Sequence, residues 1–144
     1  MSGAVIEDIN DVTEELRPIS RDLISQFDIY FEGVNLECVK FLEVTYNKDT
    51  KYFARCHPVN EIYYYFTNCF YIIEIALPIC NNLTEDQKRL VLLHELFHIP
   101  PFGTDPDDKA FCKVRPHNVQ DFRVIVEQHG TLWCYDNDLN FFGE

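Results

Sequence analysis

The most distinct pattern of polar and hydrophobic positions covers residues 84–99. It opens with polar residues, among which Thr84 and Gln87 have the spacing of a helix capping box. An apolar run follows, and Pro100 and Pro101, which cannot continue a helix, come directly after it. We therefore predict a helix over the whole of residues 84–99.

Segments of strand length occupy much of the first half of the chain. They are rich in β-branched and aromatic residues, and they cover residues 27–31, 38–46, 52–56, 61–66 and 70–76. Between the second and the third, residues 47–50 read Asn-Lys-Asp-Thr, which is a turn-forming sequence. We therefore predict that 38–46 and 52–56 pair as a β-hairpin.

Two more helices are predicted nearer the ends of the chain. In the first, apolar residues recur at helical spacing up to about residue 27, and Pro18 favours a start near Arg17. The second spans about residues 118–128 and is followed by a glycine that suits a helix end. Residues 1–10 show no periodic pattern and are expected to be irregular.

Together these segments predict a single α+β domain over residues 1–144. Its mixed or antiparallel sheet would pack against the 84–99 helix and the C-terminal helix. The chain has 144 residues, of which 47% are hydrophobic, and this is enough for one sizeable core. We divide the domain into an N-terminal helix and hairpin, residues 1–60, and a core, residues 61–130.

The net charge and the cysteine content limit the classes of partner and the cellular compartment that can be expected for this protein. A formal net charge of -12 disfavours binding to nucleic-acid backbones or to anionic membranes. The sequence contains no recognisable signal peptide or membrane-spanning run, so an intracellular protein is expected. None of the six cysteines belongs to a Cys-x-x-Cys pair, and in a reducing cytosol they are expected to be free and buried.

Candidate chemistry lies inside the 84–99 helix, where His94, Glu95 and His98 form the pattern His-Glu-x-x-His. Residues four apart share a helix face, so both imidazoles can bind one Zn²⁺ at about 2.0–2.1 Å. Glu95 can then reach water bound to the metal and act as a general base. The apolar flanks favour this interpretation, because buried His and Glu side chains are rarely left without partners.

A catalytic zinc site needs a third protein ligand and one open position. The downstream candidates are His117, Asp121, Glu127 and His129. We favour His117, at the start of the C-terminal helix, because imidazole suits zinc. Asp121, four residues later on the same helical face, would orient a ligating imidazole, or it would itself be the third ligand with His117 supporting it.

Four segments of the chain resemble the putative phage metallopeptidase family. They are residues 71–75, 83–88, 94–99, which read His-Glu-Leu-Phe-His-Ile, and 114–122, which contain Arg-x-His-x-Val-x-Asp-Phe. The likeness covers residues 61–130 and not the first 60. It implies a small zincin-like domain with a strand beside the motif helix, a third ligand in the second helix, and an origin in a virus or mobile element.

The leading hypothesis is a zinc-dependent metallopeptidase, with metal-activated water as nucleophile and Glu95 as general base. Its partner would be a protein or peptide substrate, aligned by main-chain hydrogen bonds if the 70–76 strand edges the cleft. The alternatives are a non-catalytic zinc-binding protein and an acidic viral effector that binds another protein. A structural zinc site has no use for Glu95, and the acidic residues are spread along the chain.

Overall fold

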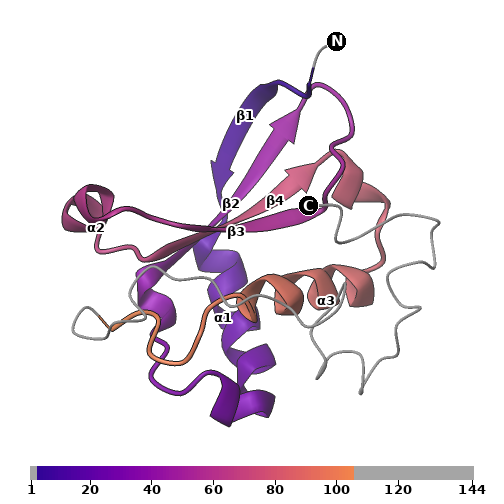
Figure 1. The fold of residues 1–144 in the computed structure, drawn as a ribbon. Coiled ribbons are helices and arrows are strands. Elements are labelled where there is room, and N and C mark those ends of the chain that lie inside the picture. The colour runs from indigo at the N-terminus through magenta and orange to yellow at the C-terminus, as the bar shows by residue number, and fades with distance from the viewer. Residues whose placement is uncertain (1–2, 106–144) are drawn as a thin grey trace.

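Residues 3–105, which the computed structural model describes, form an α+β fold with a mixed four-stranded sheet. The strands are β1 (Ile6–Asp11), β2 (Val39–Tyr46), β3 (Ala54–Pro58) and β4 (Tyr71–Leu77). The α-helices are α1 (Thr13–Ile24), α2 (Glu61–Thr67) and α3 (Glu85–Leu96), and the short 3₁₀ helices are η1 (Ser25–Tyr30), η2 (Leu36–Cys38) and η3 (Ile79–Asn82). Figure 1 shows α1 and α3 on the same side of the sheet, whereas α2 projects from one end of it.

The main core lies between the sheet and helices α1 and α3. Phe41 of β2, Ile73 of β4 and Leu96 of α3 belong to it, and none of the three has any exposed surface. Full burial of side chains of this size stabilises a fold by roughly 1.5–3 kcal/mol each. The position of α3 beneath the sheet is therefore set by packing of its apolar side.

The order of the strands is β1-β2-β4-β3, so the predicted hairpin between β2 and β3 is wrong. β4 lies between these two strands, parallel to β2 and antiparallel to β3. A turn sequence can reverse the direction of the chain, but the packing of buried side chains determines which strands pair. Here the fully buried Phe41 of β2 is paired with the fully buried Ile73 of β4. Within residues 3–105 the sheet edges are consequently β1 and β3, and the strand predicted to edge the cleft, β4, is internal.

Residues 61–66, predicted as a strand, belong to α2. Asn60 caps this helix, since its side chain accepts a hydrogen bond from the backbone N–H of Tyr63 at 2.8 Å. At the other end, Asn68 adopts the left-handed conformation, with φ of 55°, that commonly ends a helix. Local capping thus outweighs the strand preference of the aromatic residues between these two asparagines.

Residues 27–31 are also helical where a strand is predicted, because most of them belong to η1. Phe27 and Phe31, four residues apart, both contact the ring of Phe97, with centroids 5.3 Å and 4.8 Å away. A strand would direct successive side chains to opposite faces. The 3₁₀ turns of this segment, which are separated by a kink at Phe27, instead let its aromatic residues converge on the end of α3.

The first residues of the chain are not irregular, since β1 pairs antiparallel with β2. All six residues of β1 are exposed, so the strand has no buried side that would produce a hydrophobic pattern. Main-chain pairing holds it, and next to it the backbone N–H of Val5 donates to the side-chain oxygen of Asn47 at 2.9 Å.

Helix α1 begins four residues before the predicted start at Arg17 and continues through Pro18. Arg17 ties this helix to the start of β2, because its guanidinium donates hydrogen bonds to the carbonyls of Leu36 at 2.8 Å and Val39 at 3.1 Å. These contacts, with the burial of Leu23 later in the same helix, outweigh the backbone hydrogen bond that Pro18 cannot make.

Helix α3 confirms the predicted capping box. The hydroxyl of Thr84 accepts from the backbone N–H of Gln87 at 3.1 Å, and the side chain of Gln87 accepts from the backbone N–H of Thr84 at 2.9 Å. The helix ends at Leu96, three residues earlier than predicted. Beyond that point the backbone hydrogen bonds join residues three apart, as in a 3₁₀ helix. The N–H of His98, for example, donates to the backbone carbonyl of Glu95 at 3.1 Å.

The cysteines of the described region are free thiols, as predicted. Cys69 and Cys80 are buried, whereas Cys38 and Cys56 are half-buried. The remaining two cysteines and the predicted helix over 118–128 lie outside the described residues. Within residues 3–105, none of the helices has the length and apolar character needed to cross a membrane.

Candidate metal centre

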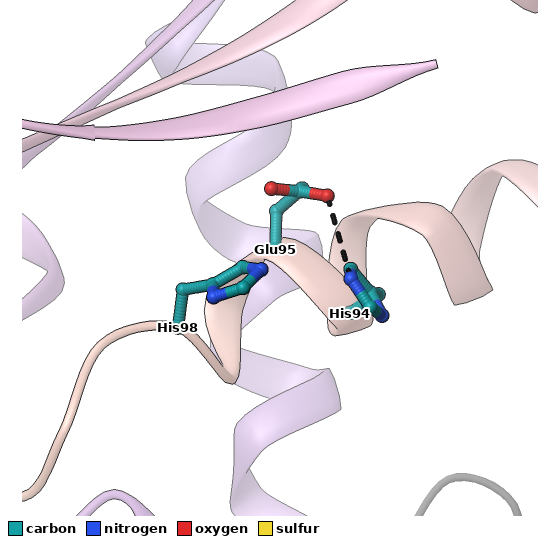
Figure 2. A group of neighbouring side chains, drawn as sticks. All are labelled: His94, Glu95 and His98. Atoms are coloured by element: carbon teal, nitrogen blue, oxygen red, sulfur yellow. Dashed lines mark ion pairs between the residues drawn. The ribbon is translucent and has the colours of Figure 1, made fainter. Parts of the chain in front are cut away.

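The end of α3 brings His94, Glu95 and His98 together beneath the sheet (Figure 2). Their exposed fractions are only 1%, 1% and 8%. The centroids of the two imidazole rings are 5.2 Å apart, and the ring planes are inclined at 80°. Nε2 of His94 lies 3.9 Å from Oε2 of Glu95. The motif therefore forms a compact polar group in an otherwise apolar part of the molecule.

This group fits a metal ion by the chemistry of its donors. One ligand atom from each of the three residues can be chosen so that all lie within 4.8 Å of one another, and within residues 3–105 no other group of three does this. Two imidazole nitrogens and a carboxylate oxygen suit zinc and other first-row divalent metals. Neutral imidazoles also tolerate burial better than charged side chains do.

Phe97, which lies between Leu96 and His98, anchors this end of α3. It is buried and contacts the rings of Phe27 and Tyr30 in η1 and of Phe31 directly after it, at centroid distances between 4.8 and 5.7 Å. Aromatic pairs of this kind contribute about 0.5–1.5 kcal/mol each beyond the burial of their area. The cluster thus holds the backbone immediately before His98.

The segment after His98 is attached to the loop that precedes η2. The backbone N–H of Phe102 donates to the carbonyl of Glu32 at 2.7 Å. Two residues later, the hydroxyl of Thr104 accepts from the backbone N–H of Asn35 at 2.7 Å, across 69 positions of sequence. His98 is therefore held from both sides, by the aromatic cluster before it and by these bonds after it.

Strand β3, at one edge of the sheet that residues 3–105 form, packs against α3. In the middle of β3, burial raises the pKa of the Cys56 thiol well above its usual value, and the charge of Glu95 raises it further. Glu95 is therefore within electrostatic range of the middle of β3. In Figure 2 the Glu95 carboxylate points away from α3 toward the strand drawn above it. A sheet edge therefore borders the polar group.

The predicted third ligand, His117, lies outside the described residues. Asp121 also lies outside residues 3–105, as do Glu127 and His129. The prediction that His117 completes the site, with Asp121 as its support or substitute, stays a prediction.

A second polar cluster, not predicted from the sequence, surrounds Glu74 of β4. Its carboxylate accepts hydrogen bonds from the hydroxyls of Tyr46 and Tyr52, and it lies 2.8 Å from Nε2 of His57. Burial opposes ionisation of Glu74, but the hydrogen bonds from His57 and the tyrosines outweigh it, and its pKa is lowered. One acidic residue within an apolar strand is the only local signal for this cluster. His57 belongs to β3.

Comparisons with known proteins agree with the geometry of the motif. Searches of curated proteins and of solved structures found no match to this chain. A family model described as "Putative phage metallopeptidase" matches residues 11–140, which is most of the chain and includes both the motif and the segment that contains His117. On the strength of that match, the chain belongs to the putative phage metallopeptidase family.

Proposed function

We propose that this protein is a zinc-dependent peptidase, in which His94 and His98 are metal ligands and Glu95 is the general base. A metal ion and protein or peptide substrates are implied by the family. The observation that carries the finer proposal is the burial of His94, Glu95 and His98 as one compact group beside a sheet edge. Burial of polar and charged side chains without partners opposes folding, so a buried group of this kind is typical of a functional site.

The division of roles follows from the chemistry of the side chains. When bound, the metal ion supplies a Lewis acid that activates water and polarises the carbonyl of the scissile bond. Glu95 accepts the proton of the attacking water and delivers it to the leaving amine. The surrounding apolar side chains exclude bulk water, which strengthens these electrostatic interactions.

We assign the alignment of the substrate to β3, because the predicted candidate, β4, is internal. Among the strands of residues 3–105, β3 lies at an edge of the sheet. We propose that a peptide adds to the outer side of β3 as a further strand. The Glu95 charge acts on Cys56 in the middle of that strand. A peptide paired there would have its backbone near Glu95.

His117 is our proposed third ligand, and zinc our proposed metal. Imidazole suits zinc, and three protein ligands leave one position open for water. Asp121 would orient an imidazole ligand, as carboxylates near zinc sites commonly do. Both residues lie within the segment that the family model matches.

Metal content and cleavage test the proposal together. The purified chain is loaded with zinc, its metal is measured by elemental analysis, and cleavage of a random dodecapeptide library is followed by mass spectrometry. We expect about one zinc per chain and cleavage that Glu95→Gln abolishes without loss of zinc. His94→Ala and His117→Ala should lose zinc, whereas His57→Ala, a histidine outside the motif, should retain zinc.

Each proposed role has a result that contradicts it. Full cleavage by Glu95→Gln would remove Glu95 as the base. Zinc retention in His117→Ala would remove that residue as a ligand and direct attention to Asp121. Zinc binding without cleavage of any peptide would favour a non-catalytic zinc-binding protein.

A further inference from the structure

Helix α2 presents its apolar side chains to solvent. Ile62, Tyr65 and Phe66 are 71%, 78% and 84% exposed. Their spacing of three and four residues places them on one face of the helix. Within the described part of the chain, α2 contributes no buried residue. Large apolar side chains gathered in this way on a surface usually mark an interaction site.

The helix that carries this face is firmly attached to the sheet. Both of its ends are capped by asparagine, and Tyr64, on the other side of the helix, packs its ring on Phe70 with centroids 4.5 Å apart. Phe70 is buried, and its backbone N–H donates to the carbonyl of Cys38 at 2.8 Å. The exposed face is therefore held in a constant position relative to the start of β4.

The helix that carries this face directly follows the sheet edge formed by β3. β3 ends at Pro58, its pairing continues to Val59, whose N–H donates to Phe70 at 3.0 Å, and α2 begins at Glu61. Figure 1 shows α2 projecting from this end of the sheet. With a rise of about 3.3 Å per strand residue, a peptide on β3 that passes Glu95 opposite Cys56 would reach α2 within about three to five residues.

The charge of α2 indicates what its exposed face can accept. Glu61 is the only charged residue of this helix, in a chain in which 25% of the residues are charged and the net charge is -12. An uncharged aromatic and aliphatic face attracts neither a basic nor an acidic ligand, but it gains free energy when it covers apolar side chains.

We propose that the α2 face, defined as Ile62, Tyr65 and Phe66, binds apolar side chains of an extended peptide segment of the substrate. This inference rests on the proposed peptidase function and names the class of sequence that the site accepts. The bound segment pairs with β3 and then places aliphatic or aromatic residues on α2, about three to five positions from the bond that is cleaved.

Binding is measured first, in the zinc-loaded Glu95→Gln protein, which retains peptides. The probes are two fluorescent pools of random dodecapeptides, one with leucine fixed at two neighbouring positions and the other with aspartate there. We expect the leucine pool to bind more tightly, and Ile62→Ser with Phe66→Ser to weaken its binding about tenfold, as for a buried apolar anchor. The matched control, Ile9→Ser with Ile29→Ser, removes isoleucines of similar exposure from β1 and η1 and should have no effect.

Cleavage-site profiles of the wild-type protein provide the second measurement. Leucine or an aromatic residue should be enriched three to five positions from the cleaved bond, and the α2 double variant should lose that enrichment. Tyr65→Ser is a milder variant that should reduce it. Unchanged melting temperatures show that the variants are folded, as expected for side chains with this exposure.

The outcomes separate the two proposals. If nothing is cleaved but the leucine pool still binds through α2, the peptidase function fails and the docking face stands. Equal binding by the α2 variant and its control overturns the docking face. It is also overturned if α2 mediates binding to phosphatidylcholine vesicles or self-association in sedimentation, because the face would then belong to a membrane or to a second copy of the chain.

Discussion

The ring of Phe102 occupies the space that a side chain at Gly33 would need. A Cβ added to Gly33 would lie 2.2 Å from Cδ1 of that ring, and the φ of Gly33 is +72°. Phe102 itself has a positive φ of 59°, which is uncommon for a bulky residue and persists only where surrounding contacts impose it. This contact joins the loop before η2 to the segment that follows His98.

Replacing Gly33 should therefore disturb both stability and the motif. We expect Gly33→Ala to lower the free energy of unfolding by roughly 2 kcal/mol or more, since the backbone conformation and the ring contact both oppose a side chain. Urea unfolding measures this, and zinc affinity should fall as well if His98 is a ligand. Gly3→Ala is the matched control, because a Cβ there meets nothing within 4 Å. Equal effects of the two substitutions would contradict the prediction.

Glu74 should make the fold sensitive to acid. Its pKa is lower in the folded chain than the usual value of about 4.3, so its contribution to stability is complete above that pH. The contribution is lost as the pH falls through the lower, folded-state pKa. Glu74→Gln should therefore be less stable at pH 7, by about 1–3 kcal/mol, and the deficit should shrink in acid. Urea unfolding between pH 7 and pH 3 measures it, with the exposed Glu7→Gln as a control that should follow the wild type.

The capping box should be a measurable part of the stability of α3. We expect Thr84→Ala to reduce the free energy of unfolding by about 1 kcal/mol, because it removes the oxygen that accepts from the N–H of Gln87. The melting temperature would fall by about 4 °C for a domain of this size. Thr84→Ser keeps the hydroxyl and should remain close to wild type. A similar loss in both variants would show that the methyl group, not the cap, matters.

Zinc should stabilise the folded chain. At a free concentration one hundred times the dissociation constant, a bound ligand adds about 2.7 kcal/mol, which corresponds to a rise in melting temperature of roughly 10 °C. Chelation should reverse the rise, and calorimetry with and without zinc measures it. His94→Ala should abolish the response, and His57→Ala should preserve it. A response that survives in His94→Ala would place the metal elsewhere.

The sequence alone was sufficient to predict those features that form through interactions between residues close together in the chain. The capping box of α3 involves residues three apart, and His94, Glu95 and His98 lie within five consecutive positions of the chain. β2 and β4 were also predictable as strands, because their buried residues are rich in β-branched and aromatic side chains. The family resemblance rests on the same short segments.

The neighbours of these elements depend on contacts between residues far apart in sequence, and no periodic pattern contains that information. β4 separates β2 from β3 because Phe41 and Ile73 pack in the same core, and this makes β3, not β4, the edge beside Glu95. α2 became helical through its asparagine caps, although its aromatic residues favour a strand. The sequence alone thus determined the chemistry of the candidate site. Tertiary packing decided which strand borders that site and which apolar side chains stay exposed, because both depend on burial that only the folded chain creates.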